Sequence, residues 1–266
     1  MSLRVMTWNL WWHFGPWELR QPRIVDAIRE TDPDVVCLQE VWSDETDDQA
    51  EILASQLDMH VVRTDHVFYA GQSFGNAVLS RWPLERLDDL SLPRADGTAS
   101  HRRIVAARVA TPYGPWPFAS THLDHRFDRS ADRRAQICHV MELARTWRGD
   151  PTTDLPVIIG ADLNAVPDTD EVRVATGRAP GVDDIVFSDV WELVGDGAGH
   201  TWLAECPYSR DSAWPNRRLD YLLVSWPRPK PVGNPIRTWT IGHGAADDTW
   251  ASDHLGVVAE FTTPAR

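Results

Sequence analysis

Short apolar segments recur along the whole chain, and most of them have the pattern of β-strands. Within residues 3–10, Val5 and Thr7 fall on one face of an extended strand and Met6 and Trp8 on the other. Residues 35–38 form an unbroken apolar run, which is typical of a strand covered on both faces. Further strands are expected at residues 61–64, 77–80, 104–110, 116–121, 157–160, 221–224 and 255–261.

Helical patterns are fewer. Residues 22–29 and 130–147 place apolar side chains at helical spacing, and Pro22 suits a first helical turn. The acidic stretch 44–51 favours a helix start, with the helix continuing to residue 57. The Pro-rich stretch 227–235 indicates a surface loop. Because some strands connect through helices and others through short turns, we expect packed sheets flanked by helices. No repeat or long linker occurs, so we expect one domain over residues 1–266.

Composition excludes several classes of protein. The 42% hydrophobic and 24% charged residues are ordinary for a soluble globular chain. The three cysteines form no Cys-x-x-Cys pair, which excludes a zinc ribbon or a thioredoxin-like motif. We expect Cys37 and Cys138 to be buried structural thiols in a reducing compartment. The first residues lack the pattern of a signal peptide and no apolar run approaches about 18 residues, so we expect neither a signal peptide nor a membrane helix. We therefore expect a soluble, cytoplasmic monomer without membrane insertion.

The chain is strongly acidic, with a formal net charge of −13 at pH 7. This balance argues weakly against tight, non-specific binding of duplex DNA, because such proteins usually carry a basic footprint. It fits an enzyme whose clustered carboxylates are partly neutralised by divalent cations.

Metal-ligand and acid–base residue types gather at the ends of the predicted strands. Antiparallel neighbours bring the carboxyl end of one strand and the amino end of the next to the same edge of a sheet. These side chains could therefore converge on one site although they span nearly the whole chain. The residues that follow strands are Asn9, Glu40, His122, Asp124, Asp162 and Asn164, and those that precede strands are Asp220, Asp253 and His254.

These residue types suit phosphoester hydrolysis. Mg²⁺ prefers oxygen ligands, which carboxylates and amides supply. The reaction needs a nucleophilic water, charge neutralisation at the phosphoryl oxygens and help for the leaving oxygen. A histidine held by a carboxylate is a suitable general base, and Asp220 and His254 could form that pair. Alternatively, Asp220 could pair with Arg217 or Arg218.

Six short motifs occur in an order that resembles a known family. They are Thr7-Trp8-Asn9, Leu38-Gln39-Glu40, Ser120-Thr121-His122-Leu123, Gly160-Ala161-Asp162-Leu163-Asn164, Arg218-Leu219-Asp220-Tyr221 and Ser252-Asp253-His254. Together they resemble the ordered signature of the endonuclease/exonuclease/phosphatase superfamily of DNase I-like, metal-dependent phosphoesterases. The resemblance implies an α+β fold, a four-layer α/β/β/α sandwich with the site at one edge.

The resemblance also implies roles for these residues. Asn9 and Glu40 would hold the principal Mg²⁺ or Mn²⁺, with Asp253 as a further ligand. Asp162 and Asn164 would position the nucleophilic water and the phosphate. His254, with Asp220, would act as the base or would stabilise the transition state, and His122 would contact the phosphate or assist the leaving group. Whether one metal ion or two are bound stays open.

Two residues near these motifs are candidates for substrate binding. Arg126 closely follows His122 and could line the mouth of a cleft, although an ion pair with Asp128 on a solvated surface is an equal alternative. Trp11 follows Asn9 in a predicted loop and could stack on a base, with core packing as the alternative.

The sequence thus predicts a Mg²⁺-dependent phosphodiesterase that cleaves nucleic acid by in-line attack of an activated water. One alternative is a phosphatase or phosphodiesterase for a lipid, inositol or nucleotide-type small substrate, which the acidic net charge favours. A second alternative is a catalytically inactive binding module. The intact Glu40, Asp162 and His254 argue against this second alternative.

Overall fold

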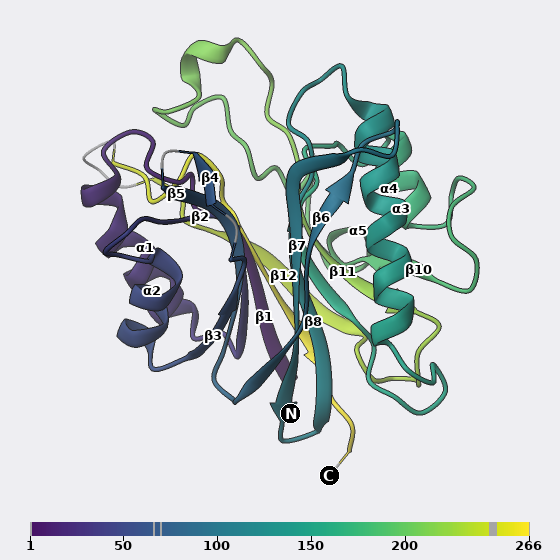
Figure 1. Cartoon of the computed structure of the whole chain (residues 1–266). Coiled ribbons are helices and arrows are strands. Elements are labelled where there is room, and N and C mark those ends of the chain that lie inside the picture. The colour runs from purple at the N-terminus through teal and green to yellow at the C-terminus, as the bar shows by residue number, and fades with distance from the viewer. Residues whose placement is uncertain (1, 66, 70, 245–248, 266) are drawn as a thin grey trace.

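Two β-sheets pack face to face in the computed structural model, which describes residues 2–65, 67–69, 71–244 and 249–265 (Figure 1). The first sheet runs in the order β12 (Pro235–Ile241), β13 (Gly256–Thr262), β1 (Ser2–Asn9), β2 (Val35–Ser43), β5 (Gln72–Ser80) and β3 (His60–Arg63), and β4 (Val67–Tyr69) pairs with β5. The second runs in the order β10 (Val186–Asp189), β11 (Asp220–Trp226), β9 (Ile158–Asp162), β8 (Gly114–His122), β7 (Ala99–Thr111) and β6 (Leu84–Pro93).

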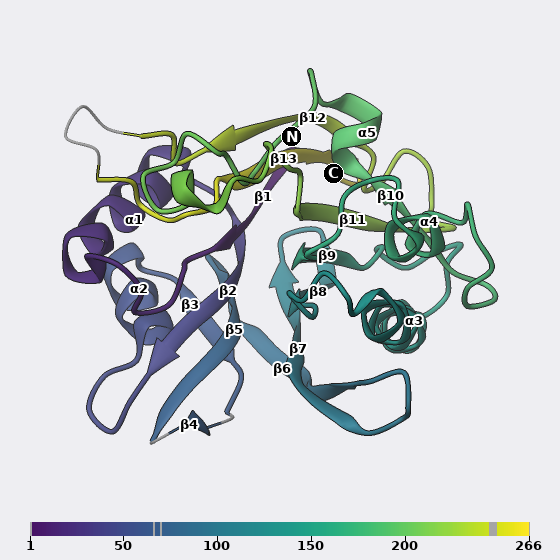
Figure 2. The same ribbon diagram turned by 90° about the horizontal axis from the view of Figure 1, so that it is seen from above.

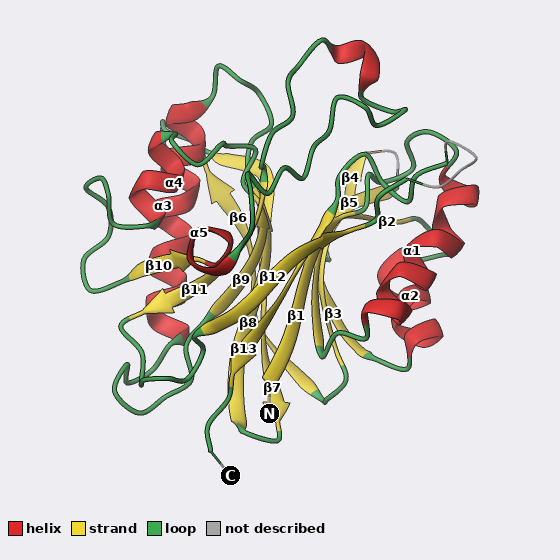
Figure 3. Cartoon of the chain, turned by 180° about the vertical axis from the view of Figure 1, so that it is seen from behind, coloured by secondary structure: helices red, strands yellow, loops and turns green. Residues whose placement is uncertain are grey.

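Helices cover the outer faces of both sheets (Figure 3). The first sheet is covered by α1 (Trp17–Thr31) and α2 (Gln49–Leu57), and the second by α3 (Ser130–Trp147) and α4 (Asp170–Ala175). A short helix, α5 (Val190–Val194), contacts β11 and β12, and η1 (Arg210–Ser212) is a single 3₁₀ turn. The expected α+β fold, a four-layer sandwich, is confirmed. Within the described residues, none of the helices combines the length and the apolarity needed to cross a bilayer.

The alternation of side chains along the strands explains the layers. Leu3 and Val5 of β1 belong to the apolar core between the sheets, whereas Met6 and Trp8 belong to the core under α1 and α2. The apolar run in β2 likewise divides its side chains between these two cores. A third core lies between the second sheet and α3. Both faces of the central strands are therefore buried, as their composition predicted.

Four strands lie outside the segments that the apolar pattern indicates: β4, β6, β10 and β12. The edge strands β6 and β12 are mostly exposed or half-buried, so their polar residues mask the strand signal. Helix α2 begins at Gln49, later than expected, because Asp48 caps it by accepting hydrogen bonds from the backbone N–H groups of Ala50 and Glu51. Asp44 instead closes a turn with Thr46.

Two expectations about single residues are wrong. Pro22 lies inside α1 and not in its first turn, because the helix already begins at Trp17. Cys138 is only partly buried, since it lies at the margin of the core under α3. Cys37 is fully buried, as expected.

Strand directions bring the predicted site residues to one edge of the sandwich. Strands β1 and β2 run parallel, as do β8 and β9, while β13 runs antiparallel to β1 and β11 antiparallel to β9. The carboxyl ends of β1, β8 and β9 and the amino ends of β11 and β13 therefore share one edge. Figure 2 looks down on this edge.

Candidate active site

Strand register places three polar residues side by side in the second sheet. Asp162, the last residue of β9, pairs with Asp220, the first residue of β11, and with His122, the last residue of β8. All three are buried. The site therefore begins as a row of polar side chains across three neighbouring strands.

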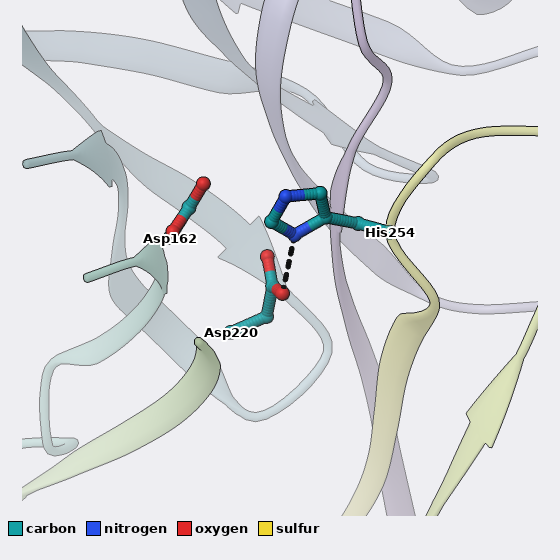
Figure 4. A group of neighbouring side chains, drawn as sticks. All are labelled: Asp162, Asp220 and His254. Atoms are coloured by element: carbon teal, nitrogen blue, oxygen red, sulfur yellow. Dashed lines mark hydrogen bonds and ion pairs between the residues drawn. The ribbon is translucent and has the colours of Figure 1, made fainter. Parts of the chain in front are cut away.

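His254 reaches this row from the first sheet, just before β13. Its Nδ1 lies 2.7 Å from Asp220 Oδ2 (Figure 4). Burial alone would lower the pKa of His254, but the charges of Asp220 and Asp253 and the bond to Asp220 outweigh burial and raise it well above its ordinary value. Arg218, which the sequence offered as an alternative partner of Asp220, forms its ion pair with Asp189, at 2.8 Å. Ligand-type atoms of Asp162, Asp220 and His254 all lie within 4.8 Å of one another.

Asp162 is held at the centre of the site by two donors. Its Oδ2 accepts a hydrogen bond from Asn9 Nδ2 at 2.9 Å, and its Oδ1 accepts one from the backbone N–H of Asn164, also at 2.9 Å. Burial and the nearby charge of Asp220 raise the pKa of Asp162 to about 6. The carboxyl group is thus fixed in position and lies close to a change of protonation near neutral pH.

His122 is a buried, neutral imidazole. Burial and the positive charge of Arg102 hold its pKa well below the ordinary value. Arg102 Nη1 lies 3.0 Å from His122 Nδ1, and a guanidinium can only donate. A donor at Nδ1 favours the tautomer with the ring proton on Nε2, which lies 3.4 Å from Asp162 Oδ2 and 2.9 Å from Asn164 Nδ2. In this tautomer the amide of Asn164 turns its oxygen toward the ring, because Nδ2 is itself a donor.

Glu40 enters the site from a bulge in β2. The register with β5 shifts between Gln39 and Val41, and Glu40 adopts a φ of 54°, in the left-handed region. Burial and the charge of Asp253 raise the pKa of Glu40 to about 7. Its Oε2 is buried without a hydrogen-bond partner among the described residues. Partly buried Asp253 also has a raised pKa, caused first by burial.

Crowded carboxylates with an unpartnered buried oxygen fit a divalent cation. The charge of Asp253 raises the pKa of Glu40, and the charge of Asp220 raises the pKa of Asp253. The positive charges of Arg102 and Arg20 oppose these shifts only in part. An added cation between Glu40 and Asp253 would remove that repulsion and would give Glu40 Oε2 a partner. The donor set is all oxygen, which suits Mg²⁺ or Mn²⁺ better than a soft metal.

A buried arginine shapes the loop that follows Asn9. Arg20 of α1 donates to the backbone carbonyl oxygens of five residues: Leu10, Trp11, Trp12, Phe14 and Ala251. Trp11 and Trp12 both have positive φ, and the backbone N–H of Trp11 donates to Asn9 Oδ1. Arg20 therefore holds the loop in a strained form that fixes Asn9 and brings Ala251, two residues before Asp253, against it.

A polar layer between the sheets lies directly beneath the site. Gln39 Nε2 donates to Thr7 Oγ1, to Ser120 Oγ at 2.9 Å and to the carbonyl oxygen of Gly160. Ser120 Oγ in turn donates to the Leu38 carbonyl oxygen at 2.7 Å. Each of these residues precedes a site residue by one or two positions. The motifs thus supply both the site and the contacts that align the two sheets below it.

The site opens into a cleft of about 760 Å³ whose wall carries many arginines. Arg126 and Trp11 both line it. Arg126 Nε also lies 3.4 Å from Asp128. Arg126 therefore both lines the cleft and forms the surface ion pair that the sequence offered as the alternative. Trp11 stacks on Tyr208 with ring centroids 4.5 Å apart. The arginines that line the cleft are Arg94, Arg102, Arg126, Arg129 and Arg217.

Arg102 and Arg20 are site residues that the motifs do not reveal. A signal for Arg102 exists in the hairpin of β7 and β8, whose turn pairs Thr111 with Gly114. Counting back from that turn places Arg103 opposite His122, and Arg102 directly precedes Arg103. Nothing comparable marks Arg20, because its partners are backbone carbonyls.

Comparisons with known proteins agree with the geometry. A profile of the Endonuclease/Exonuclease/phosphatase family matches residues 6–254. Protein angel of Drosophila melanogaster is 25% identical over 202 residues, which cover 70% of this chain and 55% of Protein angel, so the chain spans about half of that relative.

Solved structures share the fold. The D. rerio TDP2 structure complexed with single strand DNA product has a TM-score of 0.76 at 19% identity and covers 98% of this chain and 99% of its own. An endonuclease/exonuclease/phosphatase from Beutenbergia cavernae has a TM-score of 0.69 at 25% identity, covering 98% of this chain and 72% of its own. The chain therefore belongs to the Endonuclease/Exonuclease/phosphatase family, whose members hydrolyse phosphoesters.

Proposed function

We propose that this protein is a divalent-metal-dependent phosphodiesterase that cleaves nucleic acid. The observation that carries the proposal is the meeting of the His254–Asp220 pair, Asp162 and the unpartnered carboxylate of Glu40 in one arginine-lined cleft. This set of groups matches the requirements of phosphoryl transfer to water.

Glu40, Asn9 and Asp253 would hold the metal ion, Mg²⁺ or Mn²⁺. When bound, the ion supplies positive charge against the phosphoryl oxygens and the leaving oxygen. Asn9 Oδ1 already accepts one hydrogen bond, from the Trp11 backbone, and retains a second lone pair.

The remaining roles follow from hydrogen bonding and charge. Asp162, with a pKa of about 6, orients the attacking water and accepts its proton. His254, protonated by virtue of its raised pKa and held by Asp220, stabilises the negative charge of the transition state. Asn164 donates a hydrogen bond to a phosphoryl oxygen, and the Nε2–H group of the neutral His122 donates one to the leaving oxygen, which takes its proton from solvent in the open cleft.

Nucleic acid is the substrate class that the cleft favours. Arginines bind phosphates with two parallel donors, and the aromatic side chains of the wall offer flat surfaces for bases. The D. rerio TDP2 structure, which shares the fold, contains single strand DNA product. A small phosphoester of the lipid, inositol or nucleotide type is the second candidate, since a cleft of about 760 Å³ also suits a small ligand.

The first test is hydrolysis of bis(p-nitrophenyl) phosphate. Activity is expected with Mg²⁺ or Mn²⁺ and not in EDTA, and His254→Ala is expected to lower kcat by at least 100-fold. Unchanged turnover by His254→Ala, or equal turnover in EDTA, would contradict the proposal.

A panel of substrates then separates the two candidates. Single-stranded DNA and RNA oligonucleotides are compared with inositol phosphates and sphingomyelin at matched concentrations. Cleavage of oligonucleotides that falls steeply as salt rises is expected, because phosphate contacts by arginines release counterions. Preference for a small phosphoester with little dependence on salt would favour the second candidate.

A further inference from the structure

Two exposed aromatic side chains stack on each other on the wall of the cleft. The ring centroids of Phe127 and Trp214 are 4.4 Å apart with an interplanar angle of 27°. Phe127 is 54% exposed and Trp214 47% exposed, and both line the cleft. A pair that served packing alone would be covered by the protein. This pair instead leaves about half of its surface exposed.

Arg217 completes this surface. Its guanidinium carbon lies 4.7 Å from the centroid of Phe127 and 5.8 Å from that of Trp214. Throughout the described part of the chain, no carboxylate lies within ion-pair distance of Arg217. The two rings and the guanidinium, which we call the aromatic platform, thus combine flat π surfaces with a positive charge that forms no ion pair among the described residues.

Backbone pairing connects the aromatic platform to the catalytic residues. Trp202 forms a β-bridge with Arg217 on one side and another with His254 on the other side. Two strand spacings, about 10 Å, therefore separate the backbones of Arg217 and His254. Phe127 lies in the loop that follows His122 at the end of β8. A group that covers the aromatic platform can therefore belong to the same molecule as the phosphate at His254.

We propose that Phe127, Trp214 and Arg217 form a nucleobase-binding subsite for the nucleotide next to the reacting phosphate. The inference rests on the proposed function and specifies its substrate as an unpaired strand. A base offers a flat π face to the rings, whereas an inositol or a lipid headgroup has none. A base inside a duplex is already stacked on both faces, so the platform requires a single strand. Because every base has a π face, the subsite accepts all four bases.

Paired dinucleotide substrates test the subsite. Thymidylyl-thymidine is compared with analogues in which a tetrahydrofuran replaces the base on one side or the other of the phosphate. For Phe127→Ala and Trp214→Ala, KM for the base-containing dinucleotide is expected to rise about 5- to 100-fold with kcat changed less than about 2-fold. For the analogue that lacks the stacked base, the KM of the wild-type protein is expected to be high already. The KM values of the two variants for this analogue are expected to equal that of the wild type. Trp214→Tyr, which keeps a ring, should restore most of the loss.

Trp226→Ala is the matched control. Trp226 is 39% exposed and lies under Arg228 and Lys230, at 5.6 and 5.4 Å, but it does not line the cleft. Its loss should leave both KM values unchanged. If Phe127→Ala and Trp214→Ala raise KM equally with and without the base, or raise neither, the subsite is overturned.

A binding measurement separates this inference from the proposed function. A fluorescein-labelled single strand of four thymidines is titrated in EDTA and followed by anisotropy. Weaker binding by Trp214→Ala than by wild type and Trp226→Ala would support the subsite even if no phosphodiester is hydrolysed. Absence of binding by the wild type, or equal binding by all three proteins, would overturn the subsite even if hydrolysis is confirmed.

Discussion

At the scale of single residues, the contact with Arg102 favours one tautomer of His122. The guanidinium donates to Nδ1, so the neutral ring holds its proton on Nε2, on the side of Asp162. Arg102 also lies 3.0 Å from His125 Nδ1 and lines the cleft, and burial lowers its own pKa. The residue therefore sets the tautomer of His122 while it adds positive charge beside Glu40.

Replacing Arg102 by methionine should lower kcat about 10- to 100-fold, because the ring of His122 would no longer be limited to one tautomer. Nitrogen-15 NMR of the ring is expected to show the proton on Nε2 in the wild type and a mixture in Arg102→Met. Arg178→Met is the control, since Arg178 pairs with Glu192 away from the cleft. A wild-type kcat in Arg102→Met would rule out this role.

Residues at strand ends could be predicted from sequence because an apolar run followed by a carboxylate, amide or histidine is visible locally. Asn9, Glu40 and Asp162 are of this kind, and His254 carries the mirror-image signal because it directly precedes an apolar strand. Arg102 depends on a hairpin register, and Arg20 on carbonyl groups that carry no side-chain signal. Such contacts arise only when distant backbone segments meet.

At the scale of elements, the two sheets approach each other closely at Gly160. A Cβ atom on this residue would lie 2.4 Å from Cys37 Cβ and 2.7 Å from Thr7 Oγ1. Glycine is thus required in β9 by the neighbouring sheet and not by a turn. The same close approach allows Gln39 to bond to the Gly160 carbonyl oxygen from β2.

Gly160→Ala should therefore lower the free energy of unfolding by about 3 kcal/mol, because the added methyl group must push the sheets apart. The kcat of the folded variant should also fall, since the catalytic residues of the two sheets would move relative to one another. Urea denaturation and kcat measure the two effects. Gly97→Ala is the control: its methyl group would meet nothing within 4 Å, so only the strain of its φ of 82°, about 1 kcal/mol, remains.

Buried elements were more predictable than edge elements. The central strands β1, β2, β8, β9, β11 and β13 carry apolar residues on both faces and were all expected. By contrast, β6 mixes Glu85, Asp88 and Asp89 with its leucines, so its sequence carries no clear strand pattern. Its backbone is held in a strand by pairing with β7. Edge strands are specified by their neighbour rather than by their own sequence.

At the scale of the whole molecule, an ion cluster ties three strands together away from the site. Glu260 of β13 accepts hydrogen bonds from Arg4 of β1 at 2.9 Å and from Arg237 of β12 at 2.7 Å. The bond from Arg237 and then that from Arg4 outweigh burial and lower the pKa of Glu260 to about 2. Its ordinary value is 4.5, so the cluster favours the ionised form in the folded state.

The stability of the cluster should depend on pH in one direction. Because folding lowers the pKa of Glu260, its ionised carboxylate stabilises the folded state fully above pH 4.5, and this stabilisation is lost as the pH falls toward 2. Glu260→Gln should therefore cost about 2 kcal/mol at pH 7 and progressively less below pH 4.5. Urea denaturation of both proteins at pH 7, 4 and 3 measures this difference. A gap that stays constant across these values would show that charge is not the cause.

The order of layers followed from sequence because the motifs resembled a family with a known sandwich. The apolar pattern alone indicated sheets and helices without fixing which strands pair. Strand order depends on contacts such as that of β1 with β13, which joins residues about 260 positions apart.

The pairing of β1 with β13 has a practical consequence. Ser2, at the end of β1 away from Asn9, lies opposite Thr262, and Figure 1 shows both chain ends at this same end of the sandwich. A tag, dye or surface tether attached at either end would begin on the far side from the reacting groups. A circular permutant with these ends joined by a short linker, and opened in the loop of residues 227–234, should keep the cleft intact and retain turnover.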